Sequence, residues 1–533
     1  MNKRAHAVLF RAALAVSALC IVLACLPGTS AADQLTPEEK RGKQIYLKTT
    51  SPSGKDIKAF VGKSLMEAPG AALPCVNCHG YDGVGLVESG VTATTITWEE
   101  LTKAYGVKHL TGRERPAYRE DTVERAITAG VDSGGNVLDV AMPRYSMSQD
   151  DLQDLIRYLK RLGTILDPGL SETLIRVGTI LPARGRFAPM GQAMRGIMHA
   201  YFDEMNQGGG IYNRKLQLVV ADYPDNLNGT LATARQLLDE DIFAIVGAFI
   251  AGGDIEIAAL VESEEVPLVG PLTLFTEDIS ALNRFTFYLF SGLREQMRAL
   301  VEYARQQFVK PDPRVAVLYP EGEIPPDIVA AVEEQCRKQG WNSLDKTSFP
   351  AGGMDAASLV SQLRQTGTEA VFFLGSGEQL KALLRAAESA HWNPYVFVSG
   401  SRVGEGILDV PRVFSHRVFL AYPTLPSDQR DAGMNELSQL LEKHKLPRVH
   451  LAAQISAYCA AKILVEGLKR VGRNLSREKL VASLEKLHDF DTGLTPRITY
   501  DPNRRIGALG AYIVGVDLEK RDFVPVSKWI TLE

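Results

Sequence analysis

Hydrophobic and polar residues are arranged in two different ways along this chain. Before about residue 165, the clearest signal is a helical repeat of four apolar residues: Leu152, Leu155, Ile156 and Leu159. Ser148 and Asp151 precede this repeat in the order of a capping box, S-x-x-D, which marks the start of a helix. The pattern therefore predicts an amphipathic helix that begins after Ser148.

After about residue 173, short apolar runs alternate with amphipathic segments. The apolar runs predict strands over 175–181, 216–221, 244–249, 266–271, 314–319, 370–374 and 395–399. The segments between them predict helices over 189–206, 230–239, 253–261, 328–340 and 378–389. Continuously apolar strands that are separated by helices are typical of parallel sheets covered on both faces. We therefore predict two doubly wound α/β lobes, preceded by a linker rich in Pro and Gly over 166–173.

The first 32 residues predict export. Three basic residues precede an apolar run over 12–26, and small residues follow at 29–32. This order is typical of a secretory signal peptide over 1–32, and the run is short for a membrane span. Val22-Leu23-Ala24-Cys25 is a competing pattern that resembles a lipoprotein box, in which Cys25 would carry a lipid anchor. Under either interpretation we expect the chain to reach the periplasm.

Composition adds little that is specific. The chain has 533 residues, of which 45% are hydrophobic, and a net charge of -4, which suits a globular protein of two or three domains. No basic tail or stripe indicates nucleic acid as a partner. We also expect no second hydrophobic segment of membrane-spanning length.

The stretch Cys75-Val76-Asn77-Cys78-His79 carries the most specific chemistry. Two thiols three positions apart can each add to a vinyl group of one haem, and the histidine that follows then binds the iron. The alternative is a zinc or redox CxxC, but zinc needs further soft ligands and the other cysteines lie at positions 20, 25, 336 and 459. We expect one covalent haem c on Cys75, Cys78 and His79, and two buried free thiols at Cys336 and Cys459.

The iron of such a haem needs a sixth ligand, or an open face for chemistry on a small molecule. Met142 lies in Ala141-Met142-Pro143, upstream of the helix that begins after Ser148. A methionine loop followed by a capped terminal helix resembles the class I cytochrome c domain over 37–165, including a first helix over 37–47. The resemblance implies a small all-α domain with Met142 as the distal ligand, ahead of Met147, which we interpret as a core residue, and His109.

Ligation by histidine and methionine saturates the iron, so the resemblance implies single-electron transfer. The redox partner would be a periplasmic dehydrogenase or a terminal electron acceptor.

A second resemblance begins at Ile175-Arg176-Val177-Gly178. Four further segments continue it: Gly209-Gly210-Ile211, Lys215-Leu216-Gln217-Leu218, Ala244-Ile245-Val246-Gly247 and Val266-Pro267-Leu268, with Asp222 and Asp225 between them. Together they resemble the type I periplasmic binding proteins, of which the Leu/Ile/Val-binding receptors of ABC transporters are the nearest members. The resemblance implies a domain over 174–533 with lobes over 174–293 and 294–423, the remainder being shared. A small ligand would bind in the cleft, at the carboxyl ends of the strands.

Three departures from this family concern the ligand. The first-lobe hydroxyl that holds an amino acid carboxylate falls at Ala251, and the second falls at Leu274, although Thr273 is adjacent. The acid that binds the ammonium group falls near Ser401. Without these groups the cost of desolvating a zwitterion is not offset, so we expect a ligand other than an α-amino acid.

The cleft candidates are otherwise a mixed set. The ligand-binding positions are predicted to be Ala251, Gly252, Thr273, Leu274, Tyr319, Ser376 and Ser401. Phe249, Phe275 and Arg402 line the same cleft, and the set suits a less polar, aromatic or acidic organic molecule.

These patterns predict a periplasmic c-type cytochrome that transfers single electrons and is fused to a module binding a small organic ligand. One alternative is the substrate-binding component of an ABC importer, with a permease as partner and an accessory haem. Another alternative is a haem enzyme such as a peroxidase, which would need an open iron position. The receptor part contains no catalytic motif, so we expect no enzyme activity.

Overall fold

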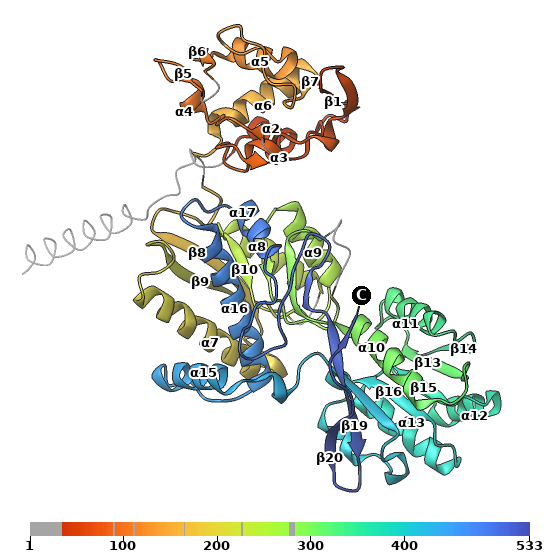
Figure 1. The fold of residues 1–533 in the computed structure, drawn as a ribbon. Helices are drawn as coiled ribbons and strands as arrows, with labels where there is room; N and C mark the ends of the chain where they lie inside the picture. The colour runs from red at the N-terminus through yellow and green to blue at the C-terminus, as the bar shows by residue number, and fades with distance from the viewer. Residues whose placement is uncertain are drawn as a thin grey trace, which may run out of the picture. The chain divides into compact units, whose positions relative to one another are not determined.

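The computed structural model describes residues 35–88, 91–109, 112–164, 166–224, 227–276 and 283–532. The predicted signal peptide, Cys25 and Asp225 lie outside these residues. The chain folds into two compact units, one ending at Leu166 and the other beginning at Asp167 (Figure 1).

The N-terminal unit is built mainly from helices. They are α2 (Pro37–Lys48), α3 (Cys75–His79), α4 (Trp98–Leu101), α5 (Glu120–Ala129) and α6 (Gln149–Arg161). The helix predicted after Ser148 is confirmed as α6, and the Ser148 hydroxyl accepts a hydrogen bond from the Asp151 amide. Helix α2 packs on α6 so closely that a Cβ on Gly42 would lie 2.0 Å from the carbonyl oxygen of Asp154.

The N-terminal unit also contains strands, so the prediction of an all-α unit is wrong. The antiparallel sheet β2-β1-β7 is formed by β1 (Lys58–Val61), β2 (Met66–Pro69) and β7 (Arg144–Ser146). Two short hairpins pair β3 (Val87–Glu88) with β4 (Val91–Thr92), and β5 (Val107–Lys108) with β6 (Glu114–Arg115). These strands have two to four residues, which is too short for a period-2 pattern to be seen in the sequence.

The first lobe of the C-terminal unit contains a parallel sheet with the order β18-β12-β11-β10-β8-β9. Its strands are β8 (Leu174–Leu181), β9 (Lys215–Asp222), β10 (Ala244–Val246), β11 (Leu268–Val269), β12 (Thr286–Phe290) and β18 (Ile506–Ala508). Its helices are α7 (Ala188–Gln207), α8 (Leu227–Asp239), α9 (Asp254–Ser263), α15 (Asp431–Lys443), α16 (Leu451–Val471) and α17 (Arg477–Leu484). Separate apolar clusters lie on the two faces of the sheet, which confirms the doubly wound prediction.

Helix α16 is unusually apolar. It is long and apolar enough to cross a membrane, which differs from the expectation of no second such segment. However, 78% of its most apolar stretch is buried inside the first lobe, so α16 is a core helix.

The second lobe contains a mixed sheet with the order β14-β13-β15-β16-β17-β19-β20, and β21 pairs with β19. Its strands are β13 (Val315–Pro320), β14 (Leu344–Phe349), β15 (Ala370–Phe373), β16 (Tyr395–Ser399), β17 (Val418–Tyr422), β19 (Gly510–Asp517), β20 (Asp522–Pro525) and β21 (Ile530–Thr531). Its helices are α10 (Leu293–Ala304), α11 (Pro326–Lys338), α12 (Ala356–Thr366), α13 (Gly377–Ser389) and α14 (Gly400–Val403). Phe372 and Phe373 of β15 face different cores, which explains why the run is continuously apolar.

The chain crosses between the lobes after β12, after β17 and between β18 and β19. The Ser291 hydroxyl joins two of these crossovers, because it donates to the Ala508 carbonyl oxygen at 3.0 Å and accepts from the Gly510 amide at 2.8 Å. Residues after 423 contribute to both lobes. Cys336 and Cys459 are free, buried and in different lobes.

The segment predicted as a linker packs against the first lobe from Asp167 onward. The Asp167 carboxylate accepts from the Arg477 amide at 2.6 Å. A Cβ on Gly169, at a φ of +79°, would lie 2.2 Å from the Phe243 backbone nitrogen. This part of the segment is therefore an ordered piece of the C-terminal unit.

Candidate functional sites

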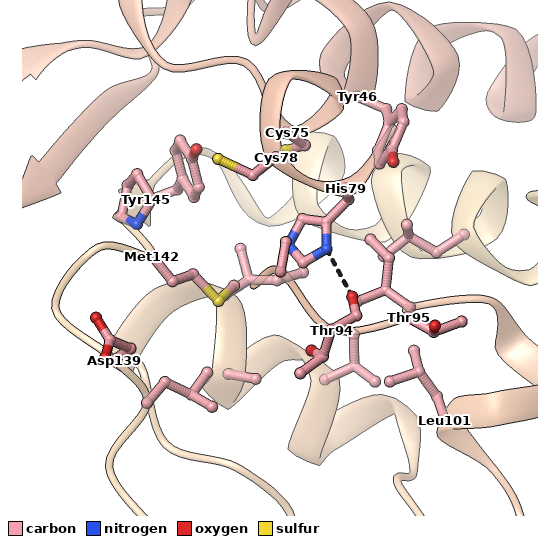
Figure 2. A pocket seen from close by; sticks show the side chains of 18 of the residues that line it. Tyr46, Cys75, Cys78, His79, Thr94, Thr95, Leu101, Asp139, Met142 and Tyr145 are labelled. Atoms are coloured by element: carbon pink, nitrogen blue, oxygen red, sulfur yellow. Dashed lines mark hydrogen bonds between the residues drawn. The ribbon is translucent and has the colours of Figure 1, made fainter. Parts of the chain in front are cut away.

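A cavity of about 230 Å³ lies inside the N-terminal unit. Helix α3 contributes Cys75, Cys78 and His79, and the loop before β7 contributes Met142 (Figure 2). Most other lining residues are apolar and include Leu101, Val123, Ala126, Ile127, Leu138, Leu155 and Leu159. The structure thus brings the four predicted haem-binding residues to one largely apolar cavity.

The environment of His79 defines which ring nitrogen faces the cavity. The side chain is buried, and its Nδ1 lies 3.0 Å from the carbonyl oxygen of Thr94. A carbonyl oxygen can only accept, so Nδ1 carries the proton and Nε2 keeps a lone pair. Burial lowers the pKa of His79, which favours the neutral imidazole that binds metals.

Only Met142 among the three candidates for the distal ligand lines the cavity. Its side chain reaches into the space beside the His79 ring (Figure 2). Met147 packs against the core of the unit, which agrees with its interpretation as a core residue. His109 pairs its Nε2 with a terminal nitrogen of Arg113 at 3.1 Å.

Arg144 holds the Met142 loop in place, a role that the sequence analysis did not identify. Its guanidinium donates to the carbonyl oxygens of Leu138 at 2.8 Å and Asp139 at 2.9 Å, and also to that of Met142. It packs against Gly130, where a Cβ would lie 2.0 Å from Nε of Arg144. Three carbonyl contacts from one planar group fix the backbone that carries the Met142 sulfur.

The two thiols of the motif differ in exposure. Cys75 is half-buried and Cys78 is exposed, and burial raises the pKa of the Cys75 thiol to about 11. No group of three or more His, Cys, Asp or Glu residues within the described ranges could hold a metal ion.

Two arginines line another part of the cavity. Arg113 pairs with Asp132 at 2.9 Å, while Arg115 is only 6% exposed and donates to the carbonyl oxygens of Leu101 at 3.2 Å and Glu100 at 3.3 Å. Burial lowers the pKa of Arg115. Among the described residues, Arg115 contacts backbone oxygens and the Tyr118 ring, and a buried guanidinium in this setting suits an anionic group in the cavity.

In the C-terminal unit, the three crossovers follow the carboxyl ends of β12, β17 and β18. Doubly wound sheets bind ligands at this edge. On the first lobe, Phe249 follows β10 and is 8% exposed. Its ring centroid lies 5.4 Å from that of Phe187 and 5.1 Å from that of Tyr223. These three rings come from the ends of β8, β9 and β10 and form what we call the aromatic cluster.

Four predicted ligand residues lie at the same edge. Ala251 is exposed and Gly252 is partly exposed in the loop that precedes α9. The Thr273 hydroxyl donates to the Asp254 carboxylate and accepts from the Phe275 amide at 3.0 Å. The Leu274 carbonyl oxygen accepts from the Leu293 amide at 2.7 Å, which places Leu274 beside a crossover.

On the second lobe, the structure brings Ser376 and Arg402 together. The Ser376 hydroxyl caps α13 by accepting from the Gln379 amide at 3.3 Å. Nε of Arg402 donates to the Gly375 carbonyl oxygen at 3.3 Å. Tyr319 lies near the end of β13, and Ser401 is exposed in α14.

Comparison with known proteins places the C-terminal unit in a family. Residues 174–522 match the family of periplasmic binding proteins. The Leu/Ile/Val-binding protein homolog 3 of Brucella melitensis is 24% identical over 320 residues, which cover 59% of this chain and 83% of that relative. The Leu/Ile/Val-binding protein homolog 7 of Brucella abortus is 22% identical over 347 residues, which cover 62% of this chain and 86% of that relative.

Solved structures show the same fold. A fatty acid ABC transporter substrate-binding protein from Thermomonospora curvata superposes with a TM-score of 0.55 at 20% identity, over 70% of this chain and 96% of that one. A branched chain amino acid ABC transporter protein from Thermus thermophilus, solved with bound valine, gives a TM-score of 0.54 at 17% identity, over 68% and 97%.

The C-terminal unit is therefore a two-lobed type I binding module. The chain belongs to the periplasmic binding protein family, whose members bind solutes and are not enzymes. Membership of this family indicates a location outside the cytoplasm.

Proposed function

We propose that the chain is a substrate-binding protein that captures a small organic molecule between its lobes for an ABC permease. The family match over 174–522 carries this proposal, because it spans both lobes and all three crossovers. The relatives support this function better than electron transfer as the main activity of the chain, because they include a Leu/Ile/Val-binding protein homolog and a fatty acid ABC transporter substrate-binding protein. Closure of the lobes about the crossovers would enclose the solute.

The proposed solute is not an α-amino acid. Ala251 and Leu274 offer no hydroxyl, Ser401 offers no carboxylate, and the Thr273 hydroxyl is already bonded to Asp254. A zwitterion between the lobes would therefore lose more hydration than these residues replace.

A ligand screen tests this function. The full chain would be mixed with organic acids, alcohols, aromatics and amino acids, and its melting temperature recorded. A compound that binds at a hundred times its Kd should stabilise the C-terminal unit by about 2.7 kcal/mol. Stabilisation by leucine or valine, with no response to the other compounds, would refute the exclusion of amino acids.

We further propose that the N-terminal unit is a c-type cytochrome domain over 37–165. When bound, the haem would supply reversible one-electron chemistry at its iron. Three features support the fit: the thiols of Cys75 and Cys78 line the cavity with His79, the lone pair of His79 Nε2 is free of the Thr94 bond, and Met142 enters the same cavity.

The roles of the residues follow from their contacts. Cys75 and Cys78 would anchor the group covalently, and Thr94 holds the His79 ring so that Nε2 faces the cavity. Arg144 fixes the Met142 loop, and the apolar lining excludes water. Met142 as a second iron ligand would argue against the peroxidase alternative. The electrons would pass to or from a periplasmic dehydrogenase or a terminal electron acceptor.

A visible spectrum of the chain, expressed in the periplasm with c-type haem maturation, tests this proposal. We expect a low-spin spectrum with a weak far-red band from sulfur-to-iron charge transfer. A high-spin spectrum would instead favour the peroxidase alternative, and absence of covalent haem would refute the cytochrome assignment.

A further inference from the structure

We infer that the solute is an aromatic carboxylate, whose anionic group binds Arg402 on the second lobe and whose ring rests on the aromatic cluster of the first lobe. This inference rests on the proposed solute-binding function and specifies the chemical class of its ligand. Two observations at the carboxyl edges of the two sheets support it. One concerns the anionic group of the solute and the other concerns its ring.

The first observation is the state of the Arg402 guanidinium. Its side chain is 14% exposed, although it is charged. Within the described part of the chain it has two polar contacts, the Gly375 carbonyl oxygen at 3.3 Å and the Glu323 carboxylate at 3.7 Å. A guanidinium carries five N–H donors in a planar fork. Most of these donors are therefore left for another acceptor.

The position of Arg402 decides which acceptor is suitable. It follows β16, Gly375 follows β15 and Glu323 follows β13, so the three residues share the ligand-binding edge of the second sheet. Glu323 is 48% exposed, so solvent partly screens its ion pair with Arg402. Burial also lowers the pKa of Arg402, while the Glu323 carboxylate acts in the opposite direction. A carboxylate can meet the fork with two parallel hydrogen bonds.

The second observation is the aromatic cluster. Phe249 is nearly buried between Phe187 and Tyr223, with tilted and edge-on ring contacts. Phe187 and Tyr223 are themselves only partly buried, and the Arg186 guanidinium stacks over the Phe187 ring at 4.5 Å, so the rest of the two rings remains available at the edge of the first sheet. Rings packed in tilted and edge-on geometry present faces and edges against which a further aromatic ring can gain buried area and ring contacts of the same kind.

Together these observations favour an aromatic acid over other solutes. A neutral aromatic would leave the Arg402 donors that do not contact Gly375 or Glu323 without an anionic partner, and an aliphatic acid would not use the ring contacts. The cluster also differs from a general apolar lining, because its three members are all aromatic and come from three different strand ends.

Calorimetric titration of the full chain with benzoate tests the inference. Benzyl alcohol has nearly the same size without the charge, and octanoate has the charge without the ring. We expect benzoate to bind at least about tenfold more tightly than either compound, as expected for a desolvated ion pair and an added ring contact. Arg402→Gln should weaken benzoate binding by about tenfold or more, and Arg402→Lys should restore part of it.

Arg417→Gln is the matched control in the same lobe. Arg417 lies at the amino end of β17, stacks on the Tyr395 ring at 4.9 Å and donates to the Asn393 carbonyl oxygen at 2.9 Å. This variant should bind benzoate as the wild type does. The melting temperature of both variants without ligand separates loss of binding from loss of folding.

Each outcome has one meaning. If benzoate does not bind, or if it binds no more tightly to wild type than to Arg402→Gln, the inference is overturned. If octanoate, benzyl alcohol or another solute of the ligand screen binds in that case, the proposed solute-binding function stands. If no solute of the screen binds, both fall.

Discussion

In the N-terminal unit, Cys75, Cys78 and His79 lie on one short helix, whereas the candidate ligand residues of the C-terminal unit come from strand ends between residues 187 and 402. The first arrangement encodes its chemistry in five consecutive residues. The second encodes a sheet, and the ligand contacts depend on which loops the sheet brings to its edge. The sequence of the N-terminal unit therefore predicts a cofactor, whereas the sequence of the C-terminal unit predicts a fold but not its ligand.

The largest expected effect concerns the motif itself. Cys75→Ala combined with Cys78→Ala should abolish covalent haem, because no other thiol among the residues that the structure describes lines the cavity. Haem stain after denaturing electrophoresis measures this loss. Cys336→Ala is the matched control, since this free thiol lies in the other unit and should leave the haem content unchanged. Haem retained by the double variant would contradict the attachment.

The motif was found in the sequence because its chemistry depends on spacing alone. Arg144 and Arg115 were missed as cavity residues, because their roles depend on backbone oxygens that are brought near only by folding. Helix α6 was predicted since its apolar face and its Ser148 cap are both local. No local signal distinguishes the carbonyl contacts of an arginine from a solvated charge.

In the C-terminal unit, too, features with a local sequence signal were predicted, and features that depend on the folded neighbours were missed. Strands β15 and β16 were predicted from their continuous apolar runs, and both are buried on two faces. Strand β14 was missed because it lies at the edge of the sheet, and Phe349 is its one fully buried residue. Thr273 was predicted as a ligand contact, but its pairing with Asp254 depends on the start of α9.

The next largest effect separates Met142 from Met147. With the haem held as proposed, Met142→Ala should remove the second iron ligand, which would give a high-spin spectrum and a reduction potential shifted by roughly tenths of a volt. Met147→Ala removes a partly buried core methionine and should change stability but leave the spectrum intact. Optical spectra and redox titration of the two variants measure the difference. An unchanged spectrum in Met142→Ala would show that another residue is the ligand.

A packing variant tests whether the two units are stable separately. Gly42→Ala would place a Cβ 2.0 Å from the Asp154 carbonyl oxygen and force α2 away from α6. We expect this to destabilise the N-terminal unit by about 3 kcal/mol. Scanning calorimetry should show the transition of this unit shifted and that of the C-terminal unit unchanged.

Gly352→Ala is the control, because a Cβ there would have no heavy atom within 4 Å. It should shift neither transition. If Gly42→Ala lowered the melting temperatures of both transitions equally, the two units would unfold as one. The two units could then not be treated as independently stable.

The smallest expected effect lies in the crossovers. Ser291 is 3% exposed, and Ser291→Ala would leave the Gly510 amide and the Ala508 carbonyl oxygen without their partner. An unpaired buried donor costs about 1–2 kcal/mol, so the C-terminal transition should fall while the N-terminal transition stays in place. Because Ser291 joins two crossovers, solute affinity in this variant reports whether they act together. A loss of affinity with no loss of stability would mean that Ser291 contributes to closure of the lobes and not to their folding.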